Sequence, residues 1–308
     1  MFERKTMNTI NIDEEILSNE ASKLLKKIIN EGFEIAQIRN LPQNKVGDEI
    51  FSYLLFQICH GRNPTKEMIF NDILYNLKVS DEINDPLRVF ISDKEYVKIF
   101  VKATIGDEYN VPTLGIINEI QDIEIYEFPD KSIIKPTHLS GKVILNTGQN
   151  QIDRAEIKKW FKINYYETWR EKNYRTLRPK IIIEPILFND INLNDYKFFC
   201  YKGIVKLIQV DLDRRTNHTR LFFDKKWNKK DFSIGYPISS QSPQKPLNLD
   251  HMISKVEVMA KYFEFIRIDL YSNEEKCYVG EITNCHGSGI EKVIPLNAER
   301  EFSNNIFK

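Results

Sequence analysis

The segment FIRIDLYSNEEKCYVGEITNCHGSG, residues 265–289, decides how this chain is interpreted. Alternation of apolar and polar residues predicts strands at 265–271 and 277–283, joined by a turn. Asp269 lies in the first strand and Glu281 in the second. Charges within apolar strands need partners when they are buried, so the pattern favours a functional site over an ordinary sheet.

The turn between these strands decides whether Asp269 and Glu281 face the same way. A turn with an odd number of residues, such as 272–276, pairs Tyr271 with Cys277 and brings both carboxylates to one face, whereas an even turn separates them. Two adjacent carboxylates offer the hard oxygen ligands that Mg²⁺ prefers. The sequence therefore predicts an odd turn and a metal site beside it.

A segment upstream, SIIKPTHLSGKVIL, is suited to binding phosphate. Lys135 and Lys142 flank the small residues Ser140 and Gly141, where backbone N–H groups can approach phosphate oxygens closely. The alternative is an ordinary hairpin with solvated lysines. The loop is not a Walker A motif, because the required first glycine is missing.

Two further segments place charges in strands. Glu184 interrupts the apolar run IIIEPIL, which indicates either an adenine hinge or a strand edge. Lys197, Arg214 and Arg215 lie within 195–215, where they can reach phosphates or can line the polar face of an antiparallel sheet.

Around these segments the chain has the pattern of an α+β protein. Helical spacing of apolar residues fills about the first ninety positions, and short strands follow after Gly106. The 44 basic and 44 acidic residues give a formal net charge of zero, which argues against a nucleic-acid partner. We expect a cytoplasmic protein, because its four cysteines lack C-x-x-C spacing and no stretch resembles a signal peptide or membrane span.

The order of these motifs resembles the ATP-grasp ligases: lysine and small-residue loop, Glu in a strand, Asp-x-Lys, then Arg-x-Asp and Glu-x-Thr. The branch it resembles is the TupA-like one, named for teichuronopeptide biosynthesis, from about Phe70 to about Pro295. The resemblance implies two α+β lobes that clasp ATP, preceded by a helical N-terminal region. The implied units are 1–90 for the helical region, 91–183 for the small lobe and 184–308 for the large lobe with the Mg²⁺ site.

The resemblance also implies roles for individual residues. The side chains and loop residues implied to bind ATP are Lys98 or Lys94, Lys135, His138, Ser140, Gly141, Lys142, Glu184, Leu187 and Lys197. The implied metal ligands are Asp269, Glu281 and Thr283. The implied catalytic cations are Arg267, Lys197 and Arg214.

The chain departs from the branch at several of these positions. Thr283, followed by Asn284, stands where many ATP-grasp enzymes have a third metal ligand, an asparagine. Leu139 and Lys142 replace glycines of the loop, and the pair Cys285-His286 stands where a proline is usual. We therefore expect a less flexible loop with an added charge.

The implied reaction joins a carboxylate to an amine at the expense of ATP, through an acyl phosphate, with ADP and phosphate released. The branch implies a sugar carboxylate, such as a uronic acid, and an amino acid or other amine in bacterial surface-polysaccharide or capsule biosynthesis. The partners expected are a small-molecule or glycan carboxylate and an amine. We expect the protein to have no transmembrane segment and to act at the periphery of membrane-bound glycan assembly.

Two other functions compete with ligation. Asp211 and Asp213 form a D-x-D motif, which is typical of metal-dependent nucleotide-sugar glycosyltransferases. Residues 158–175 interleave basic and aromatic side chains, which can bind a glycan or can form the buried side of a helix that packs Trp160, Phe161 and Tyr165.

Overall fold

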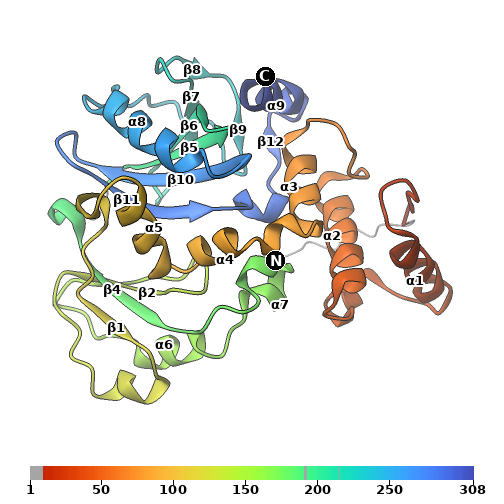
Figure 1. Ribbon diagram of the computed structural model, residues 1–308, viewed down its shortest axis with the longest axis horizontal. Helices are drawn as coiled ribbons and strands as arrows, with labels where there is room; N and C mark the ends of the chain where they lie inside the picture. The colour runs from red at the N-terminus through yellow and green to blue at the C-terminus, as the bar shows by residue number, and fades with distance from the viewer. Residues whose placement is uncertain (1–9, 191–192, 215) are drawn as a thin grey trace.

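The computed structural model describes residues 10–190, 193–214 and 216–308, and it contains two main antiparallel sheets with helices around them (Figure 1). Helices of the N-terminal part, coloured red and orange in Figure 1, gather on one side of the molecule. Arg215, one of the cations considered above, lies outside the described residues. Within those residues, no helix has both the length and the apolar character needed to cross a bilayer.

The N-terminal part is helical, as expected. Its elements are α1 (Asn19–Asn30), η1 (Ile35–Asn40), α2 (Lys45–His60), α3 (Phe70–Val79), η2 (Glu82–Asn84), α4 (Pro86–Ser92), α5 (Tyr96–Thr104) and η3 (Asp107–Tyr109). Helix α2 begins where the Asn44 side chain accepts a hydrogen bond from the Gly47 N–H at 2.9 Å. It ends at Gly61, whose left-handed φ of 69° suits glycine. A buried ion pair of 2.8 Å joins Asp48 of α2 to Arg170, the residue that follows helix α7 (Tyr165–Trp169).

The smaller sheet has the strand order β1-β4-β2-β3. Its strands are β1 (Gly115–Ile117), β2 (Ser132–Pro136), β3 (Ile144–Asn146) and β4 (Ile181–Pro185). The short helices around it are η4 (Ile120–Glu124), α6 (Arg154–Trp160), α7 (Tyr165–Trp169), η5 (Lys172–Tyr174) and η6 (Leu187–Asn189). One face buries Ile134 and Ile183 against Trp160 of α6. Because side chains alternate, the other face carries Lys135 and Glu184.

The larger sheet has the order β11-β10-β5-β6-β7-β8. Its strands are β5 (Asp195–Tyr201), β6 (Ile204–Leu212), β7 (Thr219–Phe223), β8 (Lys229–Lys230), β10 (Phe265–Ser272) and β11 (Cys277–Thr283). The remaining elements are β9 (Ser233–Ile234), α8 (Leu249–Ala260), η7 (His286–Gly289), β12 (Val293–Ile294), η8 (Leu296–Ala298) and α9 (Glu299–Phe307). One face packs on α8 through residues such as Ile268 and Val256, and α8 lies across that sheet in Figure 1. The opposite face combines a charged centre with an apolar patch covered by Phe302 of α9.

The hairpin of β10 and β11 corrects one prediction. The pairing of Tyr271 with Cys277 is wrong: Ser272 pairs with Cys277 and Tyr271 with Tyr278, so the connecting turn is even. A register shift after Asp269 leaves Gly280 as the extra residue, so Asp269 pairs directly with Glu281 and the two carboxylates share a face despite the even turn. Glycine is required there, because a Cβ atom would lie 2.6 Å from the Tyr271 ring.

Candidate active site

The charged centre of the larger sheet is assembled by strand register. Asp269 of β10 pairs with Lys197 of β5 on one side and with Glu281 of β11 on the other. Lys197 Nζ lies 2.8 Å from Asp269 Oδ2 and also donates to Asp195. Arg214 extends this group, because its Nη1 lies 3.0 Å from Asp195. The sheet thus brings together most of the residues predicted for the large lobe.

Arg267 forms a two-pronged contact with Asp269. Its Nε lies 2.7 Å from Oδ1 and its Nη2 lies 2.8 Å from Oδ2. Arg267 Nη2 also donates to Thr283 Oγ1 at 2.9 Å. Burial alone would raise the pKa of Asp269, but Arg267 and Lys197 outweigh it and hold that pKa below its usual value. Asp269 is therefore a carboxylate at neutral pH.

Glu281 is much less enclosed than Asp269. Its side chain is 29% exposed, against 5% for Asp269. Its partner is Lys94, whose Nζ lies 3.7 Å from Oε1 of Glu281. The same Nζ donates to the carbonyl of Leu139 at 2.5 Å, in the loop after β2. Lys94 thus connects the predicted phosphate loop to the carboxylate pair.

The smaller sheet contributes Glu184 between two lysines. Lys135 Nζ lies 2.5 Å and Lys98 Nζ 2.7 Å from its two carboxylate oxygens. Burial raises the pKa of Glu184, but both lysines outweigh it and lower the pKa overall. Lys98 also donates to the Val111 carbonyl at 2.6 Å and to Thr113 Oγ1 at 2.8 Å, so all three of its N–H groups are used. Lys98 is thus saturated by protein acceptors, whereas Lys135 has only Glu184 among the described residues.

The loop after β2 separates inward from outward residues. His138 is buried, with Nε2 3.1 Å from the Trp160 carbonyl, and burial lowers its pKa. Ser140 and Gly141 are exposed, and Gly141 has a φ of 73° with open space around its Cα. Lys142 is exposed and lies 3.5 Å from Glu156. The loop therefore presents Ser140 and Gly141 outward and turns His138 into the core.

The other predicted positions are placed as follows. Leu187 is half-buried in η6, directly after β4. Asn284 is buried and exchanges hydrogen bonds with Arg88, with its Oδ1 accepting at 2.9 Å, so its side chain is committed to α4. Thr283 faces Arg267 instead. Of the two candidates for a third ligand, only Thr283 lies on the carboxylate face.

Several of the residues that suggested the competing functions are buried. Asp211 is buried and accepts from Arg220 Nε at 2.7 Å, whereas Asp213 is exposed beyond the end of β6. In the aromatic segment, Trp160 is almost fully buried and Phe161 and Tyr165 are half-buried, but two short helices, α6 and α7, replace the single helix that was expected. These placements favour structural roles for both motifs.

The oxygen donors fit Mg²⁺ delivered with a nucleotide. No group of three or more His, Cys, Asp or Glu side chains capable of holding a metal occurs in the described parts of the chain. Mg²⁺ is commonly held by one or two carboxylates, with phosphate oxygens and waters completing its octahedron. The adjacent carboxylates of Asp269 and Glu281 match this pattern.

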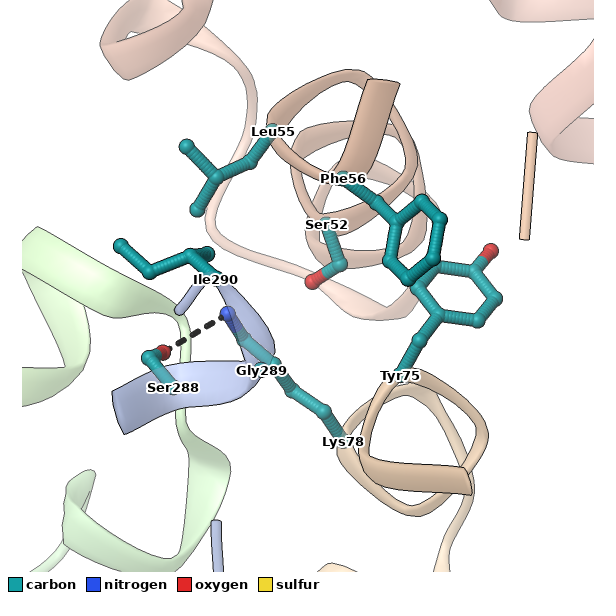
Figure 2. Close-up of a pocket in the computed structure, with 8 residues that line it drawn as sticks. All are labelled: Ser52, Leu55, Phe56, Tyr75, Lys78, Ser288, Gly289 and Ile290. Atoms are coloured by element: carbon teal, nitrogen blue, oxygen red, sulfur yellow. Dashed lines mark hydrogen bonds between the residues drawn. The ribbon is translucent and has the colours of Figure 1, made fainter. Parts of the chain in front are cut away.

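A second buried group was missed from the sequence. Lys78 of α3 reaches Ser288 Oγ at 3.1 Å, and Figure 2 shows both residues beside a cavity of about 10 Å³. Ser288 also donates to Glu171, which is only 3% exposed and has one carboxylate oxygen without a partner. Burial raises the pKa of Glu171 to about 7. Lys78 and Glu171 come from segments far apart in the sequence, so no local pattern predicted that they would meet.

Glu171→Gln is expected to remove a pH-dependent loss of stability. The folded-state pKa of Glu171, about 7, exceeds the ordinary value of 4.5, so the folded state binds more protons between these values. Its contribution to the free energy of unfolding then falls as pH rises from about 4.5 to above 7, by up to about 3 kcal/mol. Urea denaturation of both proteins at pH 5 and pH 8 measures the difference, with the exposed Glu167→Gln as control. If the difference in free energy of unfolding between Glu171→Gln and the wild type is the same at pH 5 and pH 8, the raised pKa of Glu171 is wrong.

The two-sheet fold, with Glu184 between two lysines and an Arg-x-Asp strand, is that expected of an ATP-grasp protein. The sequence profile described as TupA-like ATPgrasp matches residues 73–307. The chain therefore belongs to the TupA-like ATP-grasp family. The resemblance inferred from the motifs is confirmed, and so is the α+β ATP-grasp fold with a helical N-terminal region.

Two solved structures illustrate the similarity found, at low identity. D-alanine–D-alanine ligase from Helicobacter pylori is 15% identical, with a TM-score of 0.36, over 66% of this chain and 56% of that one. L-amino acid ligase from Bacillus licheniformis is 13% identical, with a TM-score of 0.41, over 72% of this chain and 51% of that one. The chain thus spans little more than half the length of these two structures. No protein of curated function matches the sequence.

Proposed function

We propose that the protein is an ATP-dependent, ADP-forming ligase that joins a carboxylate to an amine through an acyl phosphate. The observation that carries this proposal is the pairing of Asp269 with Glu281, surrounded by Arg267, Lys197 and Lys94. A carboxylate pair within such a cluster of cations suits the phosphates of a metal-bound nucleotide.

The chemistry has two steps. A substrate carboxylate oxygen attacks the γ-phosphorus of ATP, the bond to the β–γ bridging oxygen breaks, and ADP leaves. The amine nitrogen then adds to the acyl carbon, loses a proton and expels phosphate, which leaves an amide. Arg267 and Lys197 would donate to the transferring phosphoryl group, and Arg267 to the oxyanion of the second step. Mg²⁺, held by Asp269 and Glu281, would offset phosphate charge.

We assign the other predicted residues by their contacts. Lys135, Ser140 and Gly141 would contact phosphates. Lys94, and not Lys98, would be the other ATP-binding lysine of the small lobe. Glu184 and Leu187 would border the adenine, and Arg214 would support Asp195. His138, Lys142 and Thr283 remain predicted site residues.

The substrates and the place of the reaction are part of the proposal. We propose a sugar carboxylate, such as a uronic acid, as acceptor and an amino acid or other amine as nucleophile, in surface-polysaccharide biosynthesis. ATP as substrate implies a cytoplasmic reaction. The proposed lobes are 91–183 and 184–308 after a helical region of 1–90, and the boundary between the lobes falls within β4, next to Glu184.

ADP release screened across uronic acid derivatives and amino acids tests this function. We expect release only when a carboxylate and an amine are both present, and we expect hydroxylamine in place of the amine to trap the acyl phosphate as a hydroxamate. Consumption of a nucleotide sugar without ADP formation from ATP would instead support the glycosyltransferase alternative.

Lys135→Met is expected to weaken binding of a non-hydrolysable ATP analogue by about ten-fold or more, because a charge-assisted contact to phosphate is lost. Lys98→Met should mainly lower stability, because its three N–H groups serve protein acceptors. Titration calorimetry and urea denaturation separate the two effects. Equal losses of affinity in the two variants, at equal stability, would contradict the distinction.

A further inference from the structure

Arg267 is held from one side by a buried histidine. Nη1 of Arg267 lies 2.5 Å from Nδ1 of His286, and Nε2 of His286 lies 3.1 Å from Oε2 of Glu291. An arginine can only donate, so Nδ1 of His286 accepts, and Nε2 carries the proton that is donated to Glu291. The two contacts therefore define a neutral ring in a single tautomer.

Glu291 is itself fixed in place. Arg220 Nη1 lies 2.6 Å from its Oε2. Two glycines with positive φ leave room for its side chain: a Cβ on Gly235 would lie 2.6 Å from Oε2, and a Cβ on Gly287 would lie 2.7 Å from Cγ. Backbone and side chains together thus hold the carboxylate against His286.

The contacts close into a ring within the site. Arg220 Nε donates to Asp211 at 2.7 Å, and Lys197 Nζ lies 4.0 Å from Asp211 and 2.8 Å from Asp269. Asp269 in turn accepts a hydrogen bond from Arg267, which completes the cycle of contacts. Because His286 contacts Arg267 directly, its displacement would remove the partner of Nη1, while Asp269 would still hold the Nε and Nη2 side of the guanidinium.

We propose that His286, oriented by Glu291, is a positioning residue for Arg267. Four of the five guanidinium N–H groups go to Asp269, Thr283 and His286, which leaves one N–H of Nη1 without a partner among the described residues. The contact with Nδ1 sets the direction of that N–H. The inference rests on the proposed function in one respect: this N–H is taken to contact the transferring phosphoryl group.

The tautomer can be tested without any substrate. In the ¹⁵N NMR spectrum of histidine-labelled protein at neutral pH, we expect the His286 ring to carry its proton on Nε2 alone. The signal is assigned by its loss in His286→Gln. A proton on Nδ1, or on both nitrogens, would overturn the proposed contact with Arg267, whatever the reaction of the enzyme.

The positioning role is tested with matched variants. In His286→Asn the amide oxygen can replace Nδ1 as acceptor, whereas in His286→Gln the amide nitrogen can replace Nε2 and the contact with Arg267 is lost. We expect His286→Gln to bind MgADP with aluminium fluoride, a mimic of phosphoryl transfer, about ten-fold more weakly than His286→Asn, with MgADP alone within about twofold. His251→Gln, at an exposed histidine, is the control. Equal binding by the Asn and Gln variants would overturn the role, whereas failure of the wild type to bind MgADP would count against the proposed function.

Discussion

Glu281→Gln is expected to lower MgATP-dependent ADP release by at least about a hundredfold, while the free energy of unfolding stays within about 1 kcal/mol of the wild type. Glutamine keeps the shape of the side chain but removes the negative charge that would hold Mg²⁺. The effect on stability is small, because Glu281 is 29% exposed and its Lys94 partner lies 3.7 Å away. ADP release at saturating Mg²⁺ and urea denaturation measure the two quantities.

Glu275→Gln provides a matched control, because Glu275 is an exposed glutamate in the turn of the same hairpin. This variant should keep wild-type turnover and stability. Full activity in Glu281→Gln, or the same loss of activity in both variants, would show that Glu281 does not hold the metal.

The hairpin also shows how far the sequence could predict the site. Alternation placed Asp269 and Glu281 in two strands, and they do share a face, although the predicted turn and register are wrong. Counting only whether the turn has an odd or even number of residues overlooks a bulge within the strands. Gly280 is the extra residue because the Tyr271 ring occupies the space of a side chain, and that packing depends on the folded strand. A glycine inside a predicted strand was the available signal.

Other features of the site depend on contacts that no linear pattern contains. Lys94 and Lys98 are equally plausible from sequence, and only the three protein acceptors around Lys98 distinguish them. His286 was noted only as a departure from the family pattern. Its role depends on Glu291 and on Arg220, which lies in a distant strand. Motif order therefore predicted the family and the central carboxylates, but it could not predict how the charges share their hydrogen bonds.

Asp269→Asn is expected to abolish turnover and also to lower the free energy of unfolding by about 3–5 kcal/mol. Asp269 is 5% exposed, and it receives two hydrogen bonds from Arg267 and one from Lys197. A neutral amide leaves Arg267 without its main anion and Lys197 without one of its two close carboxylates, whereas Glu281 has no comparable contacts. The two carboxylates should thus have similar effects on turnover but different effects on stability, which ADP release and urea denaturation can resolve.

A second substitution separates charge imbalance from a general loss of packing. Lys197→Met combined with Asp269→Asn removes one buried charge of each sign, so the double variant should lose less stability than the sum of the two single losses, by about 1–3 kcal/mol. Turnover should remain absent, because neither the metal ligand nor the phosphate-binding lysine is restored. Strictly additive losses would mean that Asp269 and Lys197 do not stabilise each other, and the charged centre could not then be treated as one interacting network.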